Sequence, residues 1–148
     1  MDMKLKGKNA IVTGGAGGFG EAIAYALGAE GANLIVSDIN VERAETVAEK
    51  CRGLGVKAHA VRTDLTEEKD CFDLIDRTEA LLGSADILIN NAGLWPTNLV
   101  VDIPMQEWKR TFDINMTAVF LTCQRFVQKV LAREGKGKIL NITSQAAF

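Results

Sequence analysis

Short apolar runs alternate along the chain with apolar residues at helical spacing, and this alternation predicts the secondary structure. Residues 9–13, 33–37 and 86–90 are short and mostly apolar, whereas residues 57–62 alternate between apolar and polar side chains. Such runs predict strands, and the run at 86–90 is typical of a strand covered on both faces of a parallel sheet. Residues 138–143 form the fifth predicted strand.

Apolar residues recur at intervals of three and four between these strands, which predicts amphipathic helices. The helices are expected over residues 19–29, 41–54, 67–82 and 115–133, and Pro104 is expected to open another. In the last helix the side chains expected to face inward are Val119, Phe120, Cys123, Phe126, Val127 and Val130. Strand followed by helix, repeated in this way, predicts right-handed crossovers and a doubly wound parallel sheet of the α/β class. No linker or internal repeat divides residues 1–148, so we expect one domain.

The composition is that of a globular domain and argues against two classes of partner. The 148 residues are 47% hydrophobic and 24% charged, with a net charge of -2, so the chain can bury a core without a metal or disulfides. Nucleic acids and anionic membranes are bound by clustered Lys and Arg, which this sequence lacks. No apolar run reaches the roughly 20 residues of a membrane span. We therefore expect neither a nucleic acid nor a membrane as partner.

The cysteine and histidine content predicts a cytoplasmic protein without a metal site. Cys51, Cys71 and Cys123 are odd in number and include no C-x-x-C pair, which favours reduced thiols in the cytoplasm. Residues 1–8 contain no apolar segment of the kind found in secretory signals. His59 is the only histidine, so we expect an ordinary strand or loop residue and no zinc site.

A glycine-rich segment joins the first predicted strand to the first predicted helix. Residues 13–20 read T-G-G-A-G-G-F-G, which fits both G-x-G-x-x-G and T-G-x-x-x-G-x-G. Residues without Cβ let the backbone approach a pyrophosphate, whose charge is stabilised by free N–H groups of the following helix. The alternative is a glycine-rich loop without a ligand. The candidate cofactor-binding residues here are Gly14, Gly15, Ala16, Gly17, Gly18, Phe19 and Gly20.

Asp38 ends the second predicted strand, 18 residues beyond Gly20. A carboxylate at this place can accept hydrogen bonds from an adenosine ribose, and its charge would repel the 2′-phosphate that distinguishes NADP from NAD. The residues that could overrule this preference, Gly17, Ile39 and Asn40, carry no positive charge. Asp38 and its neighbour Ile39 are therefore candidate contacts for NAD. The alternative for Asp38 is a cap on the helix that follows.

Two further motifs follow in order, Asp64-Leu65 after the third predicted strand and N-N-A-G at 90–93 after the fourth. With the glycine segment at 13–20, they make the chain resemble the classical short-chain dehydrogenase/reductase family from residue 4 to residue 148. The resemblance implies a Rossmann fold that forms one dinucleotide-binding domain over the chain. It adds to the candidate cofactor contacts Asp64, Leu65, Asn91, Ala92 and Gly93.

The same resemblance implies two catalytic residues, Ser144 and Asn115. The Ser144 hydroxyl would hydrogen-bond the substrate oxygen, and the Asn115 backbone would hold a water in a proton relay. Without the family, Asn115 is interpreted as a helix N-cap and Ser144 as a turn residue. The family also uses a tyrosine with a lysine four residues later. Here the only tyrosine is Tyr25, and Ala29 follows four residues after it.

These features predict an oxidoreductase that moves a hydride between NAD(H) and a small carbonyl or secondary alcohol. One alternative is a cofactor-binding or dimerising fragment without turnover. Another is an S-adenosylmethionine-dependent methyltransferase, which N-N-A-G together with Asn115 and Ser144 argues against. We expect the N-terminal part of a longer enzyme, truncated after the fifth strand, because that strand would otherwise leave an apolar edge unpaired. The family implies a homo-oligomer, a dimer or tetramer, formed through the helix at 115–133.

The two tryptophans have open roles. Trp95 and Pro96 follow N-N-A-G directly, in a loop expected to overhang the nicotinamide side of the cleft. Either the substrate or simple loop packing would explain this pair. Trp108, on the next helix, is interpreted as an interface or core residue.

Overall fold

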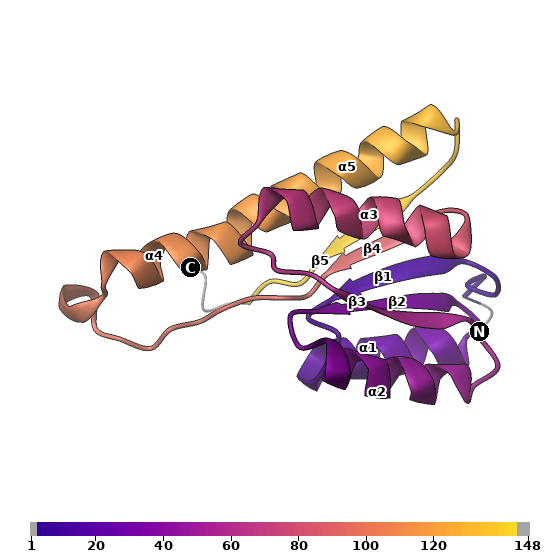
Figure 1. Cartoon of the computed structure of the whole chain (residues 1–148), viewed down its shortest axis with the longest axis horizontal. Helices are drawn as coiled ribbons and strands as arrows, with labels where there is room; N and C mark the ends of the chain where they lie inside the picture. The colour runs from indigo at the N-terminus through magenta and orange to yellow at the C-terminus, as the bar shows by residue number, and fades with distance from the viewer. Residues whose placement is uncertain (1–2, 145–148) are drawn as a thin grey trace.

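A five-stranded parallel sheet forms the centre of the computed structural model, which describes residues 3–144 (Figure 1). Its strands are β1 (Asn9–Thr13), β2 (Asn33–Asp38), β3 (Ala58–Arg62), β4 (Ile87–Asn90) and β5 (Lys138–Asn141). They lie in the order β3-β2-β1-β4-β5. The chain therefore builds the sheet outward from β1 to β3, then crosses to the other side of β1 and continues with β4 and β5. This arrangement confirms the doubly wound α/β fold, and β1 and β4 flank its topological switch point.

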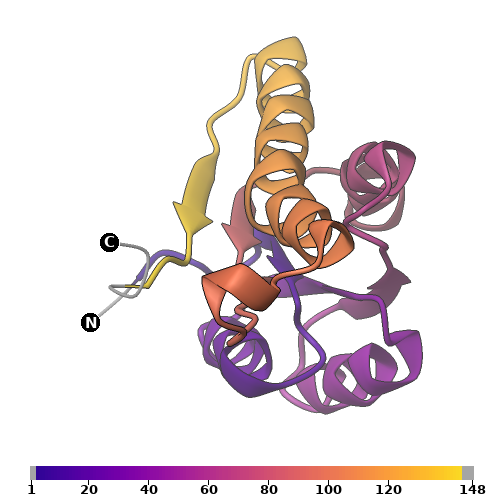
Figure 2. The ribbon, with the colours of Figure 1, turned by 90° about the vertical axis from the view of Figure 1, so that its left-hand side faces the viewer.

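Helices cover both faces of the sheet. The helices α1 (Gly18–Ala29) and α2 (Val41–Arg52) lie on one face, and α3 (Glu68–Leu82) and α5 (Ala118–Ala132) lie on the other. The short helix α4 (Met105–Phe112) runs into α5 through a π-helical turn, η2 (Asp113–Thr117), and a 3-10 turn, η1 (Val100–Asp102), precedes α4. Figure 2 shows the sheet between the two helical layers, with β5 beside α5.

The core consists of two apolar layers that the central strands share. Ala10, Val12 and their neighbours on β2 and β4 pack against α1 and α2. Ile11 on β1 and Leu88 on β4 point to the other face, where Phe126 of α5 and the apolar face of α3 cover them. Successive residues of a strand point to opposite faces, so a strand covered on both sides needs apolar residues at every position. This explains why the runs at 9–13 and 86–90 are so apolar.

The inward face of α5 differs from the one expected. Its buried residues are Ala118, Thr122 and Phe126, whereas Phe120 is 61% exposed and Val127 42% exposed. The expectation for Phe120 and Val127 was wrong because apolar residues occupy more of this helix than the sheet and α3 can cover. The helix also begins after the π-helical turn rather than at residue 115, and β5 ends at Asn141 rather than at residue 143.

Within residues 3–144, no helix combines the length and the apolarity needed to cross a bilayer.

Candidate functional site

The ends of β1 and β4 are joined by hydrogen bonds between Thr13 and the segment after β4. The Thr13 hydroxyl oxygen accepts from the backbone N–H groups of Asn91 (3.1 Å) and Ala92 (3.2 Å). In return the Asn91 amide donates to the carbonyl oxygens of Thr13 (3.1 Å) and Gly14 (3.2 Å). These bonds fix the glycine turn to β4 at the switch point of the sheet, where open α/β folds bind ligands.

Two glycines permit the tight turn. Gly14 has a φ of +62°, and a Cβ there would lie 2.9 Å from the Cα of Ala92. A Cβ on Gly20 would lie 2.0 Å from the Gly14 carbonyl oxygen and 2.7 Å from the Asn91 amide nitrogen. Either substitution would push the turn away from β4. The glycines at 14 and 20 therefore shape the turn, and Asn91 holds it.

The turn ends in an amide cradle at the start of α1. Gly17 is the N-cap residue, its backbone is extended, and no side chain caps the helix. The first N–H groups of α1 are therefore free to bind an anion, which the positive end of the helix also favours. A Cβ on Gly18 would meet nothing within 4 Å, and Phe19 is 80% exposed. An open backbone cradle of this kind fits the diphosphate of a dinucleotide.

Asp38 lies beside this cradle, and the backbone holds its carboxylate. One oxygen accepts from the N–H of Ala16 (3.1 Å), and the other accepts from the N–H of Asn40 (3.0 Å). The cap of α2 is Asn40, whose side chain accepts from the N–H of Arg43. The interpretation of Asp38 as the helix cap is therefore wrong. Ile39 is 54% exposed next to it.

Asp64 follows β3 on the same edge of the sheet. The N–H of Thr63 donates to the carbonyl oxygen of Asp38 (3.1 Å), which brings the two loops together. One Asp64 oxygen accepts from the backbone N–H and the hydroxyl of Thr66. These hydrogen bonds lower the pKa of Asp64, and the charges of Arg62 and Arg110 lower it further. Asp64 is thus a fixed anion, with Leu65 half-buried after it.

Asn115 fixes the loop after N-N-A-G. Its side-chain oxygen accepts from the N–H of Leu94 (2.8 Å), and its amide donates to the Leu94 carbonyl oxygen (2.7 Å). Asn115 lies inside η2, where the N–H of Ala118 donates to the carbonyl oxygen of Asp113. The helix N-cap interpretation is therefore wrong, because the residue lies within a continuous helical run. Such π-helical turns are frequent at functional sites.

A side-chain network at the end of β4 was not anticipated. The Asn90 side-chain oxygen accepts from the Thr122 hydroxyl (2.9 Å), and the Asn90 amide donates to the side-chain oxygen of Asn141 (2.9 Å) and to Cys123 Sγ (3.3 Å). Asn90 and Asn141 are register partners on β4 and β5. The only signal in the sequence was an asparagine at the end of one predicted strand, Asn90, and another within the next, Asn141. The network fixes the end of β5, and Ser144 follows three residues later as an exposed residue.

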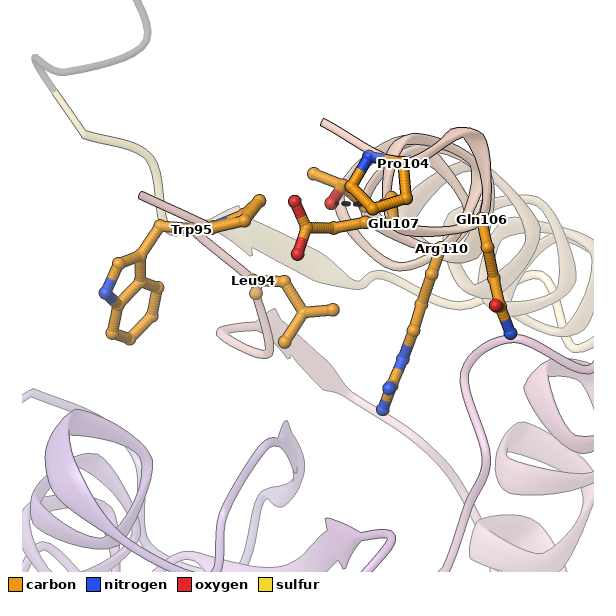
Figure 3. Close-up of a pocket in the computed structure, with 9 residues that line it drawn as sticks. Leu94, Trp95, Pro104, Gln106, Glu107 and Arg110 are labelled. Atoms are coloured by element: carbon orange, nitrogen blue, oxygen red, sulfur yellow. Dashed lines mark hydrogen bonds between the residues drawn. The ribbon is translucent and has the colours of Figure 1, made fainter. Parts of the chain in front are cut away.

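A hollow of about 640 Å³ lies between the loop at 93–96 and α4. Leu94 and Arg110 extend toward the same space, whereas the Trp95 indole points away from them (Figure 3). Trp95 is 82% exposed, so loop packing does not account for it. Trp108 is 50% exposed and contacts Phe112, with 4.7 Å between ring centroids, so it is not a core residue.

Between residues 3 and 144, no group of three or more His, Cys, Asp or Glu side chains is placed to hold a metal ion. His59 lies on β3 and is half-buried.

A family model for short chain dehydrogenases matches residues 8–148. The chain belongs to the short chain dehydrogenase family. It is 37% identical over 140 residues to 5-keto-D-gluconate 5-reductase of Escherichia coli (strain K12), covering 95% of this chain and 55% of that protein. Membership of this oxidoreductase family does not favour the methyltransferase alternative.

Solved structures of short chain dehydrogenases share the fold over almost the whole chain. A 7α-hydroxysteroid dehydrogenase complexed with NADH and 7-oxo glycochenodeoxycholic acid superposes with a TM-score of 0.91 at 38% identity, covering 97% of this chain and 55% of that one. A metagenomic short-chain oxidoreductase in complex with NADP gives a TM-score of 0.88 at 30% identity, covering 95% and 63%. The chain thus spans a little over half the length of the relatives it matches.

Proposed function

We propose that this short chain dehydrogenase transfers a hydride between NAD(H) and the carbonyl or secondary alcohol of a small molecule. The proposal rests above all on the free N–H groups at the start of α1, together with the carboxylate of Asp38, which the N–H of Ala16 holds beside them. That pairing suits a diphosphate joined to a ribose. The dinucleotide, when bound, supplies or takes up the hydride.

The proposed tasks of the residues follow the sheet edge. The amides of residues 14–20 bind the diphosphate, and Asp38 with Ile39 contacts the adenosine ribose. Asp64 and Leu65 contact the adenine, and residues 91–93 line the centre of the cleft. The Ser144 hydroxyl donates to the substrate oxygen, and the backbone at Asn115 holds a water that passes a proton. The carboxylate of Asp38 favours NAD, because it repels a 2′-phosphate.

Titration calorimetry tests the cofactor. NADH is titrated into the purified protein, and S-adenosylmethionine serves as the comparison ligand. We expect saturable heat with NADH and none with S-adenosylmethionine. Selective binding of S-adenosylmethionine, or no heat with any nicotinamide dinucleotide, would refute the proposal.

A chain that binds the cofactor without turnover is the second candidate. Tyr25, the only tyrosine of the sequence, donates to Glu21 (2.7 Å) on α1, with the Lys50 ammonium 5.6 Å from its ring centre. It is thus held by residues of α1 and α2, in the layer that covers one face of the sheet. Turnover is measured with a panel of ketones and secondary alcohols. Activity that Ser144→Ala abolishes supports the enzyme, and binding without activity supports the second candidate.

We also propose that the protein forms a homo-oligomer through an apolar stripe on α4, η2 and α5. The stripe consists of Trp108, Phe112, Met116, Phe120, Val127 and Leu131, which are 42–71% exposed. They recur mostly at intervals of four residues, so they follow one side of the continuous helical run. Exposed apolar residues gathered in this way mark protein interfaces. A second copy is the proposed occupant, as the family resemblance implies.

Sedimentation velocity tests the stripe. We expect Phe120→Glu to shift the protein toward the monomer, because a charge would be buried between the copies. Val101→Glu is the matched control, since Val101 is 84% exposed on η1, outside the stripe. A Phe120→Glu protein with unchanged sedimentation would contradict the proposed interface.

We further propose a cytoplasmic location. Cys51, Cys71 and Cys123 are all unpaired thiols, and Cys51 and Cys71 are buried. Reduced thiols are typical of proteins in reducing compartments.

A further inference from the structure

A positive charge lies against the glycine turn although no residue of the turn carries one. A Cβ on Gly17 would lie 3.1 Å from Nη2 of Arg43 and 3.8 Å from its Cζ. The Arg43 guanidinium therefore occupies the space in which a side chain at position 17 would begin. The absence of a charged residue at position 17 had favoured NAD, and Arg43 now supplies that charge from another element.

The fold brings Arg43 to this place. It is the third residue of α2, and its backbone N–H donates to the Asn40 side chain that caps the helix. Side chains of a helix lean toward its N-terminus, so a long side chain in the first turn reaches back toward the end of β2 and the glycine turn.

The guanidinium is available to a ligand. Arg43 is exposed, and no hydrogen bond or ion pair joins its side chain to any residue between 3 and 144. The hydrogen bond from Tyr25 lowers the pKa of Glu21, and the charges of Lys50 and Arg43 only lower it further. Asp38, in contrast, already accepts two backbone hydrogen bonds.

We propose that Arg43 is a specificity-determining residue that binds the 2′-phosphate of NADP and so lets this protein use both dinucleotides. The inference rests on the proposed function, which places the adenosine ribose next to Asp38. Asp38 accepts from the N–H of Ala16, and the Arg43 guanidinium occupies the space beside Gly17, so opposite charges lie next to neighbouring residues of the cradle. A guanidinium binds a phosphate through two parallel hydrogen bonds, which offsets the repulsion from Asp38.

Binding measurements on Arg43→Gln and Arg43→Lys test the proposal. Titration calorimetry with NADH and NADPH is combined with ADP and 2′,5′-ADP, a pair that differs only by the phosphate in question. We expect Arg43→Gln to weaken the binding of NADPH and of 2′,5′-ADP at least about tenfold, which is the effect of losing one charge-assisted hydrogen bond. The affinities for NADH and ADP should change less than about twofold. The NADPH affinity of Arg43→Lys should lie between those of the wild type and Arg43→Gln, because lysine keeps the charge but cannot form the two parallel hydrogen bonds.

Arg77→Gln is the matched control, because it removes the same charge from an exposed arginine on α3. It should leave all four affinities unchanged, and thermal melts verify that each variant is folded. The role of Arg43 would be overturned if Arg43→Gln lost affinity for NADH and NADPH equally. It would also be overturned if the wild type bound NADH but not NADPH. An absence of binding by both dinucleotides would instead refute the proposed function itself.

Discussion

Replacement of Thr13 by valine tests whether one hydroxyl holds the candidate site together. Thr13 is 1% exposed, and its oxygen accepts from the N–H groups of Asn91 and Ala92. Valine has nearly the same shape, so Thr13→Val leaves two half-buried N–H groups without a partner and little else changed. Each orphaned N–H costs about 1–3 kcal/mol. We expect a loss of about 3 kcal/mol in the free energy of unfolding.

Urea unfolding and thermal melts measure this loss. For a chain of this size about 3 kcal/mol lowers the melting temperature by roughly 6–12 °C. Thr13→Ser is the control, because it keeps the hydroxyl and removes one buried methyl group, at a cost of about 1 kcal/mol. If Thr13→Val is no less stable than Thr13→Ser, the hydroxyl does not join β1 to β4 as described.

Three further predictions concern the amide cradle, an ion-pair network and the thiols. Gly18 and Gly55 both have positive φ and open space around a Cβ, so alanine at either position should lower the free energy of unfolding by about 1–2 kcal/mol. Only Gly18→Ala should weaken NADH binding in a fluorescence titration. Equal NADH affinities of the two variants would contradict the cradle. The side-chain hydrogen bond from Arg125 lowers the pKa of Asp76 below its ordinary value of 3.8. Ionised Asp76 therefore stabilises the fold at pH values above 3.8, and this stabilisation is lost as the pH falls through the lowered pKa. The stability gap between wild type and Asp76→Asn in urea unfolding should therefore shrink from pH 7 toward pH 3; a constant gap would exclude the pair as its source. Burial raises the pKa of Cys71 to about 11, whereas Cys123 is only half-buried. A thiol reagent at about pH 8 should therefore label Cys123 before Cys71. Peptide mass mapping measures the order of labelling, and earlier labelling of Cys71 would contradict the prediction.

The fold could be predicted from the sequence because its signals are local. A strand covered on both faces needs apolar residues at successive positions, and residues 9–13 and 86–90 show this directly. The glycine turn was equally accessible, since the positive φ at Gly14 and the close approach at Gly20 each require a residue without Cβ. In such places one residue type at one position is physically required.

The contacts that complete the site are not local. Asn115 holds Leu94 across 21 residues through a π-helical turn, which no intrinsic preference of these residues indicates. Asn90 meets Asn141 only because β4 and β5 pair in one register. Phe120 was expected inside because it is apolar, but apolarity alone does not tell which side of α5 meets the sheet.

Arg43 shows the same limit for electrostatics. The preference for NAD followed from the charge of Asp38 and from the neutral residues beside it and in the turn. Five residues after Asp38, however, the first turn of α2 returns a guanidinium to the turn at Gly17. Neighbours in sequence therefore account for only part of the charge around a ligand subsite. The element that follows a strand can supply the rest, and the direction of its side chains decides whether it does.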